Sequence, residues 1–261
     1  MSRGRIVWWL VFLFGASYFL VPLIATLDFS LKARPPLAGY ENAFADPQFL
    51  GTLAFSFLMG LCTIAASILL LVPTAYWVRL RLPRLRPVVE LVTLLPFVVP
   101  PIVLVFGLIR IYSKPPVPLT HTETGSNVLL VAGYVVIAMP YMYRSIDAGL
   151  AAIDIRTLTE AAQSLGAGWP AIVWRIILPN VRVAIVSGAF LTLAIVLGEL
   201  VLTTYLARPA FGPYLSLLGR NKTYEPAAVS LMAFGLTWLA MLMIAFVGRR
   251  SRTRVTTVGG R

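Results

Sequence analysis

Six long apolar runs, separated by short polar connections, constrain this fold more than any other feature of the sequence. A helix needs about 20 mostly apolar residues to cross a hydrocarbon core roughly 30 Å thick. With 59% hydrophobic and only 12% charged residues, the chain cannot present the polar surface of an ordinary soluble protein. We therefore predict an all-α membrane protein with a single transmembrane domain over 1–261 and six transmembrane helices, at approximately 6–27, 50–78, 91–110, 127–145, 183–207 and 227–248.

The basic residues predict how these helices are oriented. If both termini are cytoplasmic, 15 of the 22 lysines and arginines lie on the cytoplasmic side and 7 on the outer side, as expected when positive charge is retained inside. The first run follows Arg3 and Arg5 but is longer than the core of a secretory signal, so we interpret it as a retained helix. The net charge of +12 follows from this asymmetry, and no nucleic-acid partner is needed to explain it.

Enzymatic chemistry finds no support in the sequence. The single cysteine, Cys62, and the single histidine, His121, provide no nitrogen and sulfur cluster for a metal. None of the three lysines follows a glycine, as a phosphate-binding Walker A loop requires. We therefore expect no catalytic residue, no metal site and no cofactor in this chain. If ATP and Mg²⁺ drive its function, another chain binds them.

A segment at 154–180, between the fourth and fifth runs, carries the most specific pattern. Glu160-Ala161-Ala162 is followed by Gly166 and then by Ile176, Leu178 and Pro179 at fixed offsets. The pattern predicts a short amphipathic helix that stops at Gly166 and restarts near Trp169-Pro170. Such a protrusion can dock into a groove on a partner protein. The alternative is a loop helix that lies on the membrane surface, an environment that also favours a tryptophan such as Trp169.

These landmarks, the six-run layout and the proline-rich run 95–101 resemble type I ABC importer permeases, the inner-membrane components of binding-protein-dependent transport systems. Within this superfamily the chain is most similar to the second permease of spermidine/putrescine-type systems. One departure is Val183, at a position where a further proline often follows Leu178-Pro179. The resemblance implies that segment 154–180 contains the coupling helix, with ATPase contacts at Glu160, Ala161, Ala162, Gly166, Ile176, Leu178 and Pro179.

The same resemblance implies the complex and its location. The chain would lie in the bacterial cytoplasmic (inner) membrane with both termini cytoplasmic. It would pair with a second homologous permease and two ATPase subunits, and would receive solute from an extracytoplasmic binding protein. A polyamine is the expected solute; ferric iron, thiamine, phosphonate or a sugar are alternatives within the same class.

Candidate residues of a substrate path come from polar groups and helix breakers inside the runs. Glu199 is the acid of the fifth run, and two interpretations stay open: an acid that attracts a cationic substrate, or one paired with a partner subunit or with water. In a different class of protein, Glu199 would relay protons in a secondary transporter. Prolines in the third run predict a kink or break in that helix. The bent helix would either line the substrate path or only fit the shape of the neighbouring helices. The full candidate set is Glu199, Thr203, Thr204, Tyr205, Pro96, Pro100 and Tyr134.

Overall fold

The computed structural model describes residues 3–250, and all regular elements in that part of the chain are helices. The chain separates into two compact units. Unit 1 contains residues 1–52 and 214–238, and unit 2 contains residues 53–213 and 239–261. Helices α3, α12 and α13 each cross a boundary between these units.

Unit 1 is built on long helices with little interior. Its elements are α1 (Arg3–Ser30), α2 (Ala38–Ala45), the start of α3 (Pro47–Leu80), most of α12 (Phe211–Asn221) and much of α13 (Glu225–Arg250). Gly39 of α2 allows close packing on α13, because a Cβ there would lie 3.4 Å from that of Ala228. The most apolar window of α1 has no buried residue. An apolar helix of this kind requires lipid or another protein around it.

Unit 2 holds most of the packed interior. Its elements are the rest of α3, η1 (Pro83–Leu85), α4 (Arg86–Val98), α5 (Pro101–Tyr112), η2 (Leu119–His121), α6 (Glu123–Ala151), α7 (Ile155–Ser164), α8 (Trp169–Ala171), η3 (Ile172–Ile177), α9 (Leu178–Asn180), α10 (Arg182–Gly198) and α11 (Val201–Tyr205).

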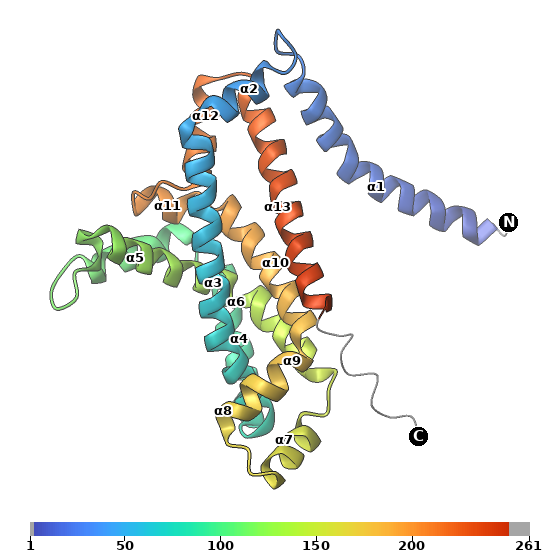
Figure 1. The fold of residues 1–261 in the computed structure, drawn as a ribbon, viewed down its shortest axis with the longest axis vertical. Coiled ribbons are helices and arrows are strands. Elements are labelled where there is room, and N and C mark those ends of the chain that lie inside the picture. Colours follow the sequence, from blue (N-terminus) through green and yellow to red (C-terminus); the bar gives the residue numbers. More distant parts are fainter. Residues whose placement is uncertain (1–2, 251–261) are drawn as a thin grey trace. The chain divides into compact units, whose positions relative to one another are not determined.

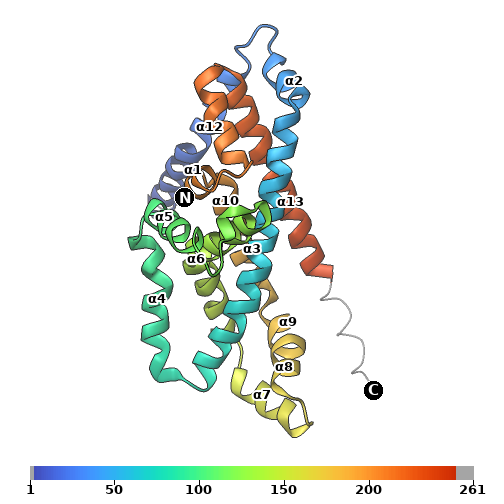
Figure 2. The ribbon, with the colours of Figure 1, turned by 90° about the vertical axis from the view of Figure 1, so that its left-hand side faces the viewer.

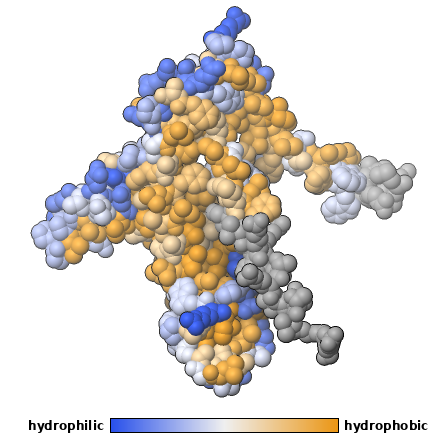
Figure 3. All heavy atoms as spheres, viewed as in Figure 1, coloured by the Kyte–Doolittle hydropathy of each residue, from blue (hydrophilic) through white to orange (hydrophobic). Residues whose placement is uncertain are grey.

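Helix α6 is the central element of unit 2, because it packs against α10, α4, α5 and α11. Close approach to α10 depends on Gly188, where a Cβ would meet the Met142 sulfur at 2.6 Å. Figures 1 and 2 show α7 and the turn between α3 and α4 at the same end of this unit. Apolar side chains cover much of the visible face of the long helices, and the end that carries α7 shows hydrophilic and hydrophobic residues side by side (Figure 3).

The number of possible membrane spans equals the six predicted runs only if two of the spans are bent. Within the described residues, four helices are long and apolar enough to cross a membrane, and the count reaches six if each bent pair forms one span. One bent pair joins 83–98 to 101–112 at 99°, and the other joins 169–180 to 182–198 at 79°. The predicted break in the third run is confirmed: α4 ends at Val98 and α5 begins at Pro101, where missing backbone donors prevent a regular helix.

One sequence prediction needs correction. The helix expected over 183–207 is not continuous, because α10 ends at Gly198 and α11 begins at Val201. Glu199 between them has an extended backbone, with φ −79° and ψ 129°, and its side chain caps the second helix. Leu178 and Pro179 are helical in α9, which ends at Asn180, and the chain turns at Val181.

Candidate functional site

Helix α7 begins at a well-formed cap. The Asp154 carboxylate accepts hydrogen bonds from the Thr157 backbone N–H at 3.1 Å and from the Thr157 hydroxyl at 2.7 Å. These bonds lower the pKa of Asp154 below its ordinary value, and the bond from the backbone N–H has the larger effect. The capping carboxylate is therefore ionised at neutral pH. Asp154 is the N-cap residue and directly precedes Ile155, the first residue of α7.

The turn after α7 has the predicted conformation. Gly166 has φ +80°, in the left-handed region that favours glycine. A Cβ at Gly166 would meet nothing within 4 Å. Glycine is therefore required at this position by the backbone angle alone, because no described side chain or backbone atom would clash with a Cβ there. The neighbouring Leu165 side chain is 88% exposed. The turn therefore presents a large apolar side chain with no cover inside the described chain.

The base of this protrusion is anchored to α3. The Tyr76 and Thr159 hydroxyls lie 3.1 Å apart and are both buried. The rings of Trp77 and Trp169 contact each other with centroids 5.7 Å apart. Ala162 is buried on the inner face of α7. A fixed base with an exposed tip is the arrangement expected of a docking element.

The other predicted coupling residues divide between the surface and the interior. Glu160 and Ala161 are exposed, and the Glu160 carboxylate pairs with the Arg156 guanidinium at 2.9 Å. In the second helix Pro179 is exposed, whereas Ile176 and Leu178 are half-buried beside the fully buried Ile177. Residues 172–177 form a π-helical turn, a feature often found at functional positions. Nothing in the sequence pattern indicated that turn.

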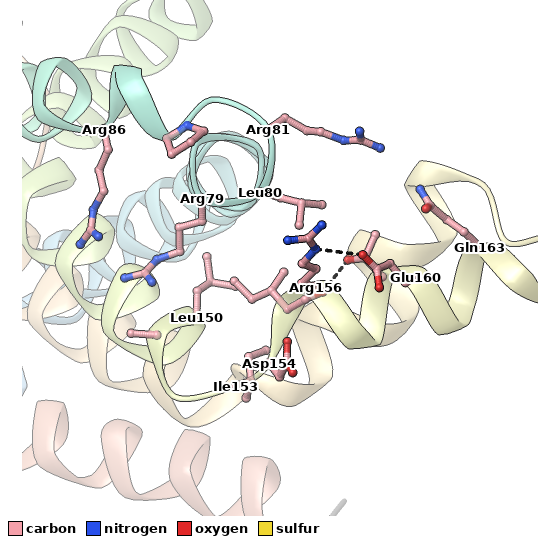
Figure 4. Close-up of a pocket in the computed structure, with 14 residues that line it drawn as sticks. Arg79, Leu80, Arg81, Arg86, Leu150, Ile153, Asp154, Arg156, Glu160 and Gln163 are labelled. Atoms are coloured by element: carbon pink, nitrogen blue, oxygen red, sulfur yellow. Dashed lines mark hydrogen bonds and ion pairs between the residues drawn. The ribbon is translucent and has the colours of Figure 1, made fainter.

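A groove of about 640 Å³ runs beside α7 (Figure 4). Its walls come from the end of α3, η1, the start of α4, the end of α6 and α7, and four arginines and two carboxylates line it: Arg79, Arg81, Arg86, Arg156, Asp154 and Glu160. The Asp147 carboxylate of α6 forms ion pairs with two of these arginines, with Arg79 at 2.5 Å and with Arg86 at 3.3 Å. This carboxylate thereby connects α6 to α3 and to α4.

Glu199 has a local role that neither sequence interpretation included. Its carboxylate accepts hydrogen bonds from three backbone N–H groups, those of Val201 at 2.6 Å, Leu202 at 3.0 Å and Thr203 at 3.4 Å. The side chain therefore caps α11, where unpaired amides would otherwise face a buried environment. No lysine or arginine of the described residues forms an ion pair with it.

Only some of the candidate path residues come together. Tyr134 and Thr203 are buried and lie within interaction distance of each other, and Tyr134 is also near Glu199. Thr204 and Tyr205 are exposed on the opposite side of α11, where Tyr205 contacts the Phe106 ring with centroids 4.8 Å apart. Pro96 lies inside the last turn of α4, and Pro100 directly precedes α5.

A buried arginine near α11 was not among the predicted site residues. The Arg208 side chain is 10% exposed, and its guanidinium lies 5.7 Å from the centre of the Phe55 ring and 3.7 Å from the exposed Glu123 carboxylate. Among the described residues its buried Nε has no hydrogen-bond partner. In the sequence Arg208 looks like an ordinary loop arginine, because its burial arises only when α3 and α6 pack beside the loop.

Comparison with known proteins decides the family. Residues 71–257, more than half of the chain, match the family described as binding-protein-dependent transport system inner membrane component. The chain belongs to this family. It is 32% identical over 186 residues to a probable molybdenum ABC transporter permease protein of Haloferax volcanii, a match that covers 68% of this chain and 67% of the relative.

A second relative and two solved structures agree. A probable ABC transporter permease protein of Sinorhizobium fredii is 29% identical over 160 residues, covering 60% of this chain and 28% of that larger relative. The fold is similar to an amino acid ABC transporter (TM-score 0.52, 16% identity, 78% of this chain and 94% of that chain). It is also similar to the MetNI methionine ABC transporter in inward-facing form (TM-score 0.54, 22% identity, 77% and 91%).

These findings establish the broad function. The protein is a membrane-embedded permease subunit of an ABC importer, with the type I fold. Such permeases are non-catalytic, and a separate chain carries the ATPase. The importer also uses a solute-binding protein, as the family description states.

Proposed function

We propose that the α7–α8 turn transmits the movement of a partner ATPase to the transmembrane helices. The observation that carries this proposal is the exposed tip at Leu165 and Gly166 on a base fixed to α3 through Tyr76 and Thr159. A tip with no cover in its own chain offers a surface to a partner, and a rigid base passes displacement on to the helices. ATP and Mg²⁺ bind to the ATPase subunits in this scheme.

In the complete transporter this chain pairs with a second homologous permease and two ATPase copies. ATP-driven closure of the ATPases draws the two docking segments together, and the permease halves rock from an inward-facing to an outward-facing state. The external binding protein then unloads its solute, and hydrolysis resets the inward state. The docking contacts are assigned to the exposed Glu160, Ala161, Gly166 and Pro179 and to the half-buried Ile176 and Leu178, whereas the buried Ala162 supports α7 from its inner face.

The coupling role is tested with two glycines of the same turn. Gly166→Leu forces a side chain into a left-handed backbone, whereas Gly168→Ala occupies an extended conformation with open space around it. In reconstituted vesicles containing all subunits, Gly166→Leu should lower solute uptake per ATP hydrolysed at least tenfold, and Gly168→Ala should behave as wild type. Wild-type coupling in Gly166→Leu would reject the assignment.

The solute class proposed here is a small oxyanion. Arg208 supports this solute class, because its buried Nε–H has no hydrogen-bond partner among the described residues. A guanidinium with such a free donor recognises tetrahedral oxyanions through parallel hydrogen bonds. The molybdenum permease relative agrees in substrate chemistry, since molybdenum occurs in oxygenated water as an oxyanion. A polyamine is the second candidate. The buried Glu199 carboxylate is the feature that favours it, although three backbone amides already engage that group.

Two measurements separate these solutes. Titration of the cognate binding protein with molybdate, sulfate, phosphate, putrescine, spermidine, ferric iron and thiamine should reveal an oxyanion as the tightest ligand. In reconstituted transporter, Arg208→Gln should slow uptake while leaving the binding protein's affinity unchanged, and Arg208→Lys should retain part of the rate because it keeps the charge. Tight binding of a cation or of thiamine would reject the oxyanion proposal while leaving the coupling assignment intact.

A further inference from the structure

The turn that joins α3 to α4 alternates arginine and leucine. Residues 79–86 read Arg-Leu-Arg-Leu-Pro-Arg-Leu-Arg. Exposed apolar side chains lead into the turn on α3, at Leu69 and Leu70, and lead out of it on α4, at Leu91 and Val92. Because both flanking helices present apolar side chains outward, the turn lies where hydrocarbon gives way to lipid headgroups.

The arginines of this turn have different partners. Arg79 and Arg86 are held by Asp147. Arg81 and Arg84 are exposed, and neither forms an ion pair with any carboxylate of residues 3–250. The leucines that follow them, Leu82 and Leu85, are 46% and 48% exposed. The turn thus projects two uncommitted guanidinium groups together with two apolar side chains.

The groove beside α7 gives this surface a recess. Arg81 contributes to one wall, from the α3 end, and Arg156 to the opposite wall on α7 (Figure 4). Arg156 is already paired with Glu160. The uncommitted positive charge at this recess therefore comes from the α3–α4 turn.

We propose that residues 79–86 and the adjoining groove bind the headgroup of an anionic phospholipid. Arg81 and Arg84 donate to the headgroup phosphate, while Leu82 and Leu85 enter the upper acyl region. Free phosphate would satisfy the arginines but leave both leucines in water. A lipid is favoured over an acidic protein surface because the exposed apolar side chains of both flanking helices continue from these leucines, and acyl chains cover all of them together.

The test uses the assembled transporter purified from a membrane, with retained lipids counted by native mass spectrometry. The probes are dioleoyl phosphatidylglycerol and dioleoyl phosphatidylcholine in equal amounts. Wild type should retain phosphatidylglycerol in preference to phosphatidylcholine. The double variant Arg81→Gln/Arg84→Gln should weaken that preference by about fivefold per arginine. The matched control Arg34→Gln/Arg110→Gln removes two exposed arginines elsewhere and should keep the preference.

Four results would overturn the proposal. The first is equal retention of the two lipids by wild type, and the second is the same loss of preference in the control variant. The third is displacement of phosphatidylglycerol by millimolar inorganic phosphate, which would identify a soluble-anion site. The last is loss of the ATPase from the Arg81→Gln/Arg84→Gln preparation with unchanged lipid preference, which would identify the ATPase as the occupant.

Discussion

Glu199 is a charged residue kept inside an apolar segment by backbone donors. Its three amide hydrogen bonds replace the water that a carboxylate would otherwise need, and they also serve the unpaired amides of α11. The sequence identified the residue but not its role, because the surrounding run is apolar enough for an unbroken helix. A usable signal was present in Glu199 followed by Thr203 and Thr204, whose hydroxyls bond back to carbonyls before α11.

Removal of the Glu199 cap should destabilise the protein. Glu199→Ala leaves buried amides without an acceptor, so we expect a loss of about 2–3 kcal/mol. Glu199→Gln keeps one acceptor oxygen and should lose less. Thermal unfolding of the purified transporter measures both. If Glu199 instead served only as a cation site, Glu199→Gln would abolish transport without lowering the unfolding temperature.

At the scale of elements, the bent helices of unit 2 were only partly predictable. Pro96, Pro100 and Pro101 predicted the break between α4 and α5, because a proline lacks a backbone N–H donor at any position in a helix. The break before α11 depends instead on a contact made in three dimensions. Gly212, at the start of α12, lies so close that a Cβ would be 2.3 Å from the Glu199 carbonyl oxygen. No local pattern reveals that approach.

This contact predicts different effects for two glycines of α12. Gly212→Ala drives a methyl group into the backbone of Glu199 and Leu200, and overpacking of this kind costs about 1–3 kcal/mol. Gly219→Ala adds its methyl in open space and should be neutral or slightly stabilising. Chemical or thermal unfolding of both variants checks the prediction. Equal stability would contradict the close approach.

The link between α6 and the ends of α3 and α4 leads to a further prediction. Asp147, whose side chain is 14% exposed, serves both Arg79 and Arg86, so Asp147→Asn should cost about 2 kcal/mol, less than the 3–5 kcal/mol typical of a fully buried pair. Glu90→Gln removes only a surface partner of Arg86 and should cost less than about 1 kcal/mol. Unfolding of the two variants under the same conditions tests the ranking. A larger loss for Glu90→Gln would show that the surface pair dominates.

At the scale of the whole molecule, the sequence predicted the membrane class and the number of apolar runs, since both depend on composition over about 20 residues. It also predicted the helix stop at Gly166 and the restart near Trp169-Pro170, because glycine and proline act within one turn. The burial of Arg208 and the close approach of Gly212 to Glu199 depend on packing between segments distant in sequence. Six apolar runs fit six spans only when each bent pair counts as one.

The six-span topology makes the last prediction. If both termini are cytoplasmic, as the distribution of basic residues predicts, the α7–α8 turn and the loop that contains α12 should lie on opposite sides of the membrane. Cysteines at Gly168 and Gly219 are suitable reporters, because both positions tolerate a side chain and are exposed. The native Cys62 is first changed to alanine to remove its exposed thiol. An impermeant thiol reagent added outside intact cells should label Gly219→Cys alone, and opening the cells should add labelling of Gly168→Cys. Labelling of both from outside would show that a bent pair folds back on its own side of the membrane and does not span it.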